Sequence, residues 1–285
     1  MSRNRMKTLC TMMLGIASMN LANRSFADDR ISPAERDDHG FLVHNVRSPY
    51  QAGPTRIRVL QPNELTPKHT YPVIYVLPVE AADGSRYGDG LLEIQRHNLH
   101  NKHHVIFVTP TFSALPWYAD HPTDAKVRQE SYLLKEIVLF VERTYPVSKN
   151  AQHRLLLGFS KSGWGAWSLL LRHPDTFGRA AAWDAPLMMT RVGQYGNRPI
   201  YGSQENFEEY RIDQLLRKNA KKLRDKPRLI LTGYGNFRTH HQQMHELLQE
   251  LTIPHVYRDG PFRKHDWHSG WVTEAVELLL EEPNS

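Results

Sequence analysis

Short hydrophobic runs alternate with segments of helical spacing along the chain, and this alternation limits its fold more than any other feature. Buried strands are predicted at 71–77, 104–108, 153–157, 179–183, 228–231 and 255–257. Helices are predicted at 91–100, around 132–141 and at 272–279. Short strands that alternate with helices indicate an α/β fold with a mainly parallel central sheet and helices on both faces.

Length and composition are typical of one large domain. The chain has 285 residues, and 40% of them are hydrophobic, which is enough for one core. We expect this domain to cover 41–285 and to begin with an antiparallel edge pair at 41–44 and 57–60. Residues 28–40 are polar and are predicted to be a flexible lead-in. The segment 186–226 breaks the alternation and is interpreted as an insertion over the sheet edge, in the manner of a partial lid.

The first 27 residues have the layout of a secretory signal peptide. Three basic residues within 3–7 precede an apolar run at 9–19, and Ser25-Phe26-Ala27 follows as a cleavage site. The run is too short and too interrupted to serve as a permanent membrane anchor. A disordered or buried N-terminal helix is the alternative. The signal interpretation predicts a secreted or periplasmic protein that begins near Asp28.

The net charge and the single cysteine both belong mainly to this leader. The formal charge of +6 includes four basic residues of the leader and no acidic ones, so +2 remains after cleavage. Cys10 also lies in the leader, which leaves the mature chain without disulfides. Cys10 lacks the small-residue context of a lipidated cysteine. No run of basic residues interleaved with aromatic ones remains, so we expect no nucleic-acid partner.

A strand, a Gly-x-Ser turn and a segment of helical spacing follow one another between residues 153 and 171. Gly158-Phe159-Ser160 ends the strand, and small residues follow. A nucleophile elbow has this order, because a strained turn must lift the serine oxygen above the sheet. The backbone N–H of Lys161 is then placed as one oxyanion donor, at the positive end of the helix. A tight turn that selects small residues for packing alone is the alternative.

His265 lies between the last predicted strand and the terminal helix, where this fold delivers its histidine to the serine. The roles follow the chain order serine, acid, histidine in this arrangement. The sequence has sixteen histidines, and most of them are expected at the surface. Neither the pair at 103–104 nor the pair at 240–241 has a comparable placement.

Together these motifs resemble a known family. The segments Leu156–Gly163, Tyr71–Leu77 and Lys264–Trp267, followed by Trp271, are similar to the putative-esterase branch of the α/β-hydrolases. That branch includes esterase D, feruloyl esterase, enterochelin esterase and mycolyltransferase-type proteins. The resemblance extends from about Phe41 to the C-terminus. It implies hydrolysis or transfer of an acyl ester, with no cofactor and no metal.

The acid of the triad departs from the family pattern. The resemblance implies a G-x-x-D sequence after the penultimate strand, but this chain has Gly233-Tyr-Gly-Asn236. An amide cannot supply the charge that stabilises an imidazolium, and in a serine triad the Asp-to-Asn change costs about ten-thousand-fold in turnover. We therefore predict Asp184, which follows the strand at 179–183, as the acid. A turn or cap role before Pro186 is the alternative.

The second oxyanion donor should come from the loop after the strand at 71–77. Related enzymes often have His-Gly there, whereas this chain has Pro78-Val79-Glu80-Ala81. Proline has no N–H, so Val79 or Glu80 must donate. A carboxylate so close to a developing oxyanion is unfavourable unless the Glu80 side chain turns away.

The sequence predicts an exported serine esterase that cleaves the ester of a small molecule or saccharide through an acyl-enzyme. Four tryptophans near the motifs are candidates for stacking sugar or aromatic rings, with core packing as the alternative: Trp117, Trp164, Trp267 and Trp271. A catalytically silent relative that binds a saccharide or a protein is the second hypothesis, because Asn236, Ser162 and Pro78 depart from the usual pattern. An acyltransferase is the third, because only access of the acceptor distinguishes transfer from hydrolysis.

Overall fold

A nine-stranded sheet organises residues 30–281, the part of the chain that the computed structural model describes. The strands are β1 (Glu35–Arg36), β2 (Leu42–Val46), β3 (Thr55–Leu60), β4 (Val73–Val76), β5 (Ile106–Pro110), β6 (Arg154–Phe159), β7 (Arg179–Trp183), β8 (Leu229–Tyr234) and β9 (His255–Phe262). Their spatial order is β1-β2-β3-β5-β4-β6-β7-β8-β9. The strands from β5 to β9 pair in parallel, and β1, β2 and β3 pair antiparallel.

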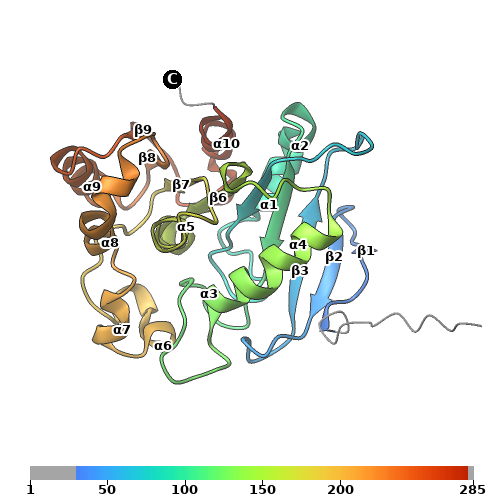
Figure 1. Cartoon of the computed structure of the whole chain (residues 1–285), viewed down its shortest axis with the longest axis horizontal. Helices are drawn as coiled ribbons and strands as arrows, with labels where there is room; N and C mark the ends of the chain where they lie inside the picture. The colour runs from blue at the N-terminus through green and yellow to red at the C-terminus, as the bar shows by residue number, and fades with distance from the viewer. Residues whose placement is uncertain (1–29, 282–285) are drawn as a thin grey trace, which may run out of the picture.

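Helices cover both faces of this sheet, as Figure 1 shows. One face carries α1 (Gly90–Arg96), α2 (Leu99–Lys102) and α10 (Val272–Leu280). The other face carries α3 (Gln129–Tyr132), α4 (Leu139–Thr144), α5 (Ser160–Arg172), α8 (Ile212–Asn219) and α9 (Arg238–Glu250). Each layer has its own hydrophobic core. The predicted α/β fold with a mainly parallel, doubly covered sheet is confirmed.

Two predicted helices differ in detail from those observed. The helix predicted at 91–100 is divided into α1 and α2, because Asn98 adopts a left-handed conformation with φ 54°. The longer helix is continuous from α3 to α4 but contains a π-helical stretch, Leu133–Val138. Its buried side chains, among them Tyr132 and Val141, face the sheet as the sequence pattern indicates.

The prediction of a flexible lead-in is wrong for residues 30–40, the part of it that the structure describes. Ile31 forms a bridge with Val46, the Ser32 N–H donates to the carbonyl of Asn45, and β1 pairs with β2. The segment thereby satisfies backbone groups that the outer side of β2 would otherwise leave unpaired. The polar composition of the segment did not reveal this pairing, because strands pair through hydrogen bonds of their backbones, whatever their side chains are.

The segment 186–226 contains α6 (Arg198–Tyr201), α7 (Gln204–Glu208) and α8. It packs against the helix that begins at Ser160, and Figure 1 shows α6 and α7 together below α5. The Trp164 indole donates to Tyr201 Oη at 2.8 Å, and the Trp164 and Phe207 rings stack at 5.8 Å. The insertion therefore buttresses α5 on the side away from β6.

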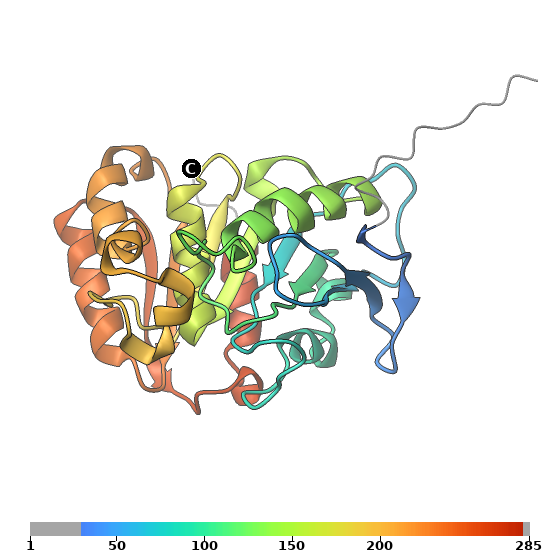
Figure 2. The ribbon, with the colours of Figure 1, turned by 90° about the horizontal axis from the view of Figure 1, so that it is seen from below.

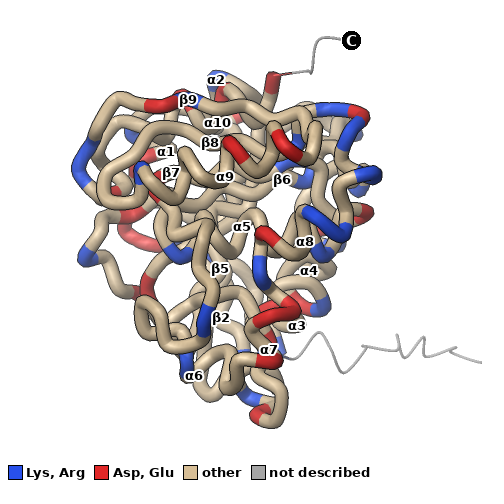
Figure 3. Tube along the Cα trace, turned by 90° about the vertical axis from the view of Figure 1, so that its left-hand side faces the viewer, with Lys and Arg blue, Asp and Glu red and all other residues tan. Residues whose placement is uncertain are grey.

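Charges of both signs are dispersed over the described surface, and Figure 3 shows Lys and Arg interspersed with Asp and Glu. Within residues 30–281, no helix has the length and apolar character needed to cross a bilayer. The predicted leader at 1–27 lies outside the described residues.

Candidate active site

Ser160 begins α5 directly after β6 and has the strained backbone of a nucleophile elbow. Its φ is 51°, in the left-handed region that residues other than glycine rarely adopt. A Cβ at Gly158 would lie 2.2 Å from the Ser162 carbonyl oxygen, so the turn requires glycine there. Ser160 is 8% exposed, which leaves its hydroxyl at the edge of the solvent.

Ser162 stands where related elbows have glycine, and its side chain holds the turn together. Its hydroxyl donates to the Phe159 carbonyl at 2.9 Å and accepts from the Phe159 N–H at 3.1 Å. Ser162 is fully buried. Its hydroxyl thus has a structural role, and Ser160 is the serine that the turn presents.

Asp184 and His265 are in direct contact. Asp184 lies at the end of β7 with φ 41°, and its Oδ2 is 2.5 Å from His265 Nδ1. The carboxylate also accepts from the N–H groups of Asn236 at 2.8 Å and Phe237 at 2.6 Å. Burial by itself raises the pKa of Asp184, but these hydrogen bonds outweigh burial and hold it below its usual range. The carboxylate is therefore charged at neutral pH.

Asn236, at the position where the family resemblance implies the acid, contacts Asp184 through its backbone N–H and not through its amide. A Cβ at the neighbouring Gly235 would lie 2.6 Å from Asp184 Oδ2. The turn after β8 is therefore shaped to receive a carboxylate from β7. The sequence placed Asp184 and Asn236 at adjacent strand ends. It did not reveal that the Asn236 backbone N–H binds the Asp184 carboxylate.

Aromatic rings surround the His265 imidazole. The Phe159 ring lies 5.0 Å away and the Tyr87 ring 5.6 Å away, both edge-on, and the Trp183 ring lies 6.3 Å away. Among residues 30–281, His265 Nε2 has no hydrogen-bond partner, and Ser160 Oγ does not reach it within hydrogen-bonding distance. Catalytic hydrogen bonds are often long before substrate binds.

The loop after β4 offers free backbone donors. Within the described residues, the N–H groups of Val79 and Glu80 donate to no other group. The Tyr118 hydroxyl donates to the Pro78 carbonyl at 2.5 Å. Because C=O and N–H point to opposite sides of a trans peptide, this bond also fixes the direction of the Val79 N–H. The Glu80 carboxylate turns into its own loop and accepts from the Tyr87 N–H at 3.3 Å.

Tyr118 and His241 support the site, and sequence reasoning assigned this role to neither: it named Tyr118, next to Trp117, only as a candidate to line a cleft. The Tyr118 ring occupies the space beside Gly165 of α5, where a Cβ would lie 2.0 Å from the ring. His241 Nε2 accepts from the Ala185 N–H at 2.9 Å, directly after Asp184. Burial lowers the pKa of His241 to about 4, so it is neutral and able to accept. Among sixteen histidines, no sequence signal distinguishes it.

A second buried carboxylate binds a histidine close to the first pair. Glu93 of α1 accepts from His268 Nδ1 at 2.8 Å and lies 3.0 Å from Arg96 and from His97. His268 Nε2 accepts from the Asp89 N–H at 3.2 Å. These contacts join the loop at 80–90 to the segment before α10, and Figure 2 shows the two side by side.

The tryptophans proposed as stacking platforms are almost inaccessible to solvent, although one of them, Trp267, contributes to the wall of a cavity beside the loop at 80–90. All four are buried in the core, with at most 2% exposure: Trp117, Trp164, Trp267 and Trp271. The alternative of core packing is therefore correct. Sequence spacing alone could not separate the two, because a buried tryptophan and one that lines a cleft both lie close to the motifs.

A cavity of about 560 Å³ lies behind the loop that carries the oxyanion donors. Val79, Asp89 and Arg58 line it, whereas Ser160 and His265 do not. Side chains of β2 and β3, among them Val43 and Arg56, also line it. Within residues 30–281, no group of three or more His, Cys, Asp or Glu side chains could hold a metal ion.

Several solved structures are similar to this chain. The Staphylococcus aureus fluorophosphonate-binding serine hydrolase FphF has a TM-score of 0.69 at 17% identity, over 88% of this chain and 100% of that one. A ferulic acid esterase has a TM-score of 0.64 at 19% identity, over 84% and 96% of the two chains. Mycobacterium tuberculosis MPT51 (FbpC1) has 0.64 at 15% identity, over 87% and 97%. Among curated proteins, none matches this sequence.

The family model described as Putative esterase matches residues 48–273. The match includes the elbow, the end of β7 and the loop of His265. The fold agrees with it, because the neighbours in structure are α/β-hydrolases. The chain thus belongs to the Putative esterase family.

Proposed function

We propose that the protein is an exported esterase in which Ser160, His265 and Asp184 form the catalytic triad. One observation carries this proposal: a charged, fully buried Asp184 binds His265 Nδ1 at 2.5 Å beside a strained serine turn. A carboxylate in that place fixes the tautomer of the imidazole and stabilises its protonated form. Nε2 remains available for the serine proton.

The reaction follows from these positions. Ser160 Oγ attacks the ester carbonyl carbon while His265 Nε2 takes the hydroxyl proton. The carbonyl oxygen becomes an oxyanion and accepts from the Lys161 N–H and from the N–H of Val79 or Glu80. The C–O bond to the alcohol then breaks, and the alcohol leaves with the proton from Nε2. Water attacks the acyl-enzyme in the same manner and releases the acid.

The substrate is an ester of a small molecule or a saccharide. Reaction with an alcohol in place of water would make the same site an acyltransferase, and the products distinguish the two. A silent binding protein becomes the better interpretation if the purified protein fails to react. Ser162 and Asn236 were two of the departures from the family pattern that favoured a silent binding protein. The structural roles of Ser162 and of the turn at 235–237 account for both.

Short-chain para-nitrophenyl esters provide the test of catalysis. We expect turnover by the unmodified protein, and a loss of at least a thousandfold in Ser160→Ala and in His265→Ala with the fold retained by circular dichroism. Turnover that persists in Ser160→Ala would reject the assignment of the nucleophile.

Export is proposed from the composition of residues 1–27, as a separate part of the function. Expression in a bacterium with a Sec pathway should yield a protein whose N-terminus is at or near Asp28. A cytosolic product that retains Met1 would reject the proposal without affecting the triad.

A further inference from the structure

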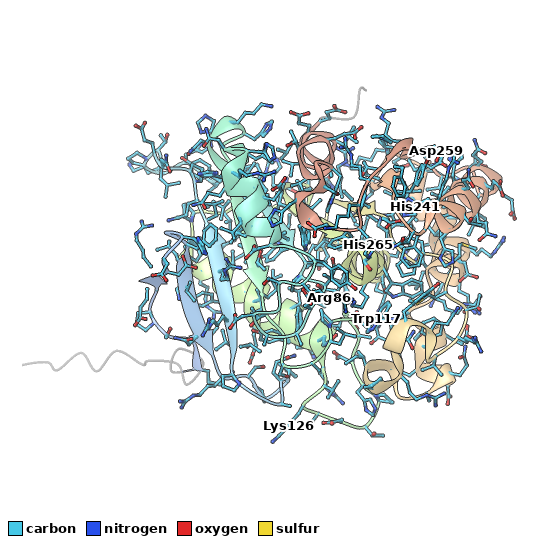
Figure 4. The ribbon with its side chains drawn as sticks, turned by 180° about the vertical axis from the view of Figure 1, so that it is seen from behind. Arg86, Trp117, Lys126, His241, Asp259 and His265 are labelled. Atoms are coloured by element: carbon cyan, nitrogen blue, oxygen red, sulfur yellow. The ribbon has the colours of Figure 1, made fainter. Side chains whose placement is uncertain are left out.

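Two cations flank one tyrosine beside the proposed nucleophile. Lys161 Nζ lies 5.9 Å from the centre of the Tyr87 ring, and Arg86 Cζ lies 5.2 Å from it. The same ring contacts the His265 imidazole at 5.6 Å. In Figure 4, Arg86 and His265 lie near each other at the centre of the molecule. The Tyr87 ring therefore links both cations to the proposed general base.

Neither cation has an ion-pair partner in the described part of the chain. Within residues 30–281, no carboxylate oxygen lies within 4.0 Å of Lys161 Nζ or of the Arg86 guanidinium. Glu80 is the acidic group that faces Lys161, but its carboxylate accepts from the Tyr87 N–H. Asp83, on the same loop, pairs with Arg56 at 3.1 Å. Two cations and one nearby carboxylate leave the rim with an excess of positive charge.

The Lys161 side chain is partly withdrawn from water. Burial lowers its pKa, and Arg86 lowers it further, whereas Glu80 raises it. An ammonium group that has lost part of its hydration without a counter-ion is held at a cost in free energy. A bound anion would remove that cost, and the positive end of α5 favours an anion at the same place. Arg86 is exposed and free to turn toward a ligand.

We propose that Lys161, Arg86 and Tyr87 form an anion-binding subsite, and that the ester substrate carries a carboxylate or a comparable anionic group close to the scissile carbonyl. The inference rests on the proposed triad and names its substrate class. The backbone of Lys161 serves the oxyanion, while its side chain, together with Arg86, binds the substrate anion. Tyr87 presents its ring to both cations.

Two matched pairs of esters locate the anion. Mono-para-nitrophenyl succinate against its methyl ester places the charge on the acyl side. Para-acetoxybenzoate against its methyl ester places it on the alcohol side. Each kcat/KM is divided by the rate constant for hydroxide-catalysed hydrolysis of the same ester, which removes differences in intrinsic reactivity. We expect the anionic member of one pair to be preferred about tenfold or more at low salt, and less at high salt because exposed charges are screened.

Three variants test the assignment. In Lys161→Met, which keeps the backbone N–H, the anionic-to-neutral ratio should fall about tenfold, and in Arg86→Gln about threefold because Arg86 is more exposed. Lys161→Arg keeps the charge and should retain most of the preference. Lys126 is an exposed lysine far from His265 in Figure 4, so Lys126→Met is the matched control and should leave the ratio unchanged.

A ratio near one in both ester pairs for the unmodified protein would overturn the subsite. So would an unchanged ratio in Lys161→Met and Arg86→Gln. If Lys161→Met does not fold, Arg86→Gln still decides, since Arg86 lies outside the turn at Ser160. Failure of the triad itself has a different signature, because neither the neutral nor the anionic esters would then be hydrolysed.

Discussion

Two buried carboxylates bind histidines of the same segment, and only one of the pairs is suited to chemistry. Asp184 binds His265 at 2.5 Å, and Glu93 binds His268 at 2.8 Å. Both carboxylates are completely buried, and both accept from Nδ1. The pairs differ at the other ring nitrogen. His268 Nε2 accepts from the Asp89 N–H, whereas His265 Nε2 has no partner among the described residues.

This difference separates a structural His–carboxylate pair from a catalytic one. The pair alone fixes an imidazole, and a free Nε2 next to a nucleophile is what allows proton transfer. Glu93 belongs to a helix and holds two further basic side chains, Arg96 and His97. Asp184 belongs to a strained turn whose remaining bonds come from backbone N–H groups. We therefore expect Glu93 to affect stability and Asp184 to affect turnover.

The largest effect is expected for Asp184→Asn. Loss of the charge behind the imidazole should lower kcat by about ten-thousand-fold, as in other serine triads, while circular dichroism shows an intact fold. Steady-state hydrolysis of a para-nitrophenyl ester is the measurement. Asn236→Ala is the matched control, because Asp184 uses the Asn236 backbone and not its amide. It should change kcat by less than about tenfold, and the reverse ranking would assign the acid role elsewhere.

An effect on stability is expected for Glu93→Gln. Hydrogen bonds to a charged group contribute about 1.5–3 kcal/mol, and the buried Glu93 makes them to His268, Arg96 and His97. The free energy of unfolding in urea should fall by about 1–3 kcal/mol, with kcat reduced far less than in Asp184→Asn. A drop in kcat as large as that of Asp184→Asn, at unchanged stability, would contradict the structural role of this pair.

A smaller effect is expected in the pH dependence of stability. The pKa of Asp184 is lowered in the folded state, so the carboxylate takes up its proton at a higher pH in the unfolded chain than in the folded protein. The resulting stabilisation is fully present above the ordinary carboxyl pKa of 3.8 and is lost as the pH falls through the lower folded value. Unfolding free energies between pH 6 and pH 3 should therefore decline less steeply in Asp184→Asn than in the unmodified protein. Parallel slopes would show that Asp184 is not stabilised as a carboxylate.

The sequence predicted the parts of the molecule that depend on local pattern. β7 covers the predicted 179–183, and the turn at Ser160 has the strained conformation that Gly158 and the following small residues indicate. Strand order was not predicted, but parallel neighbours put strand ends together, and this was enough to bring Asp184 within reach of His265.

Contacts between distant segments could not be predicted. Glu93 and His268 are 175 residues apart, and each resembles many other charged residues of the chain. The backbone donors of the turn at 235–237 carry no side-chain signal, so Asn236 appeared to be a defect. The pairing of residues 31–36 with β2 was missed for the same reason, because the partner of a strand edge is set by tertiary structure.

The central claim is that Ser160 is an activated nucleophile, and labelling with a fluorophosphonate tests it most directly. The probe reacts only with a serine whose proton has an acceptor, so labelling reports the whole triad at once. The account predicts stoichiometric labelling of the unmodified protein, a modified peptide that contains Ser160, and no labelling of Ser160→Ala. Labelling that persists in Ser160→Ala, or a modified peptide from another segment, would contradict it.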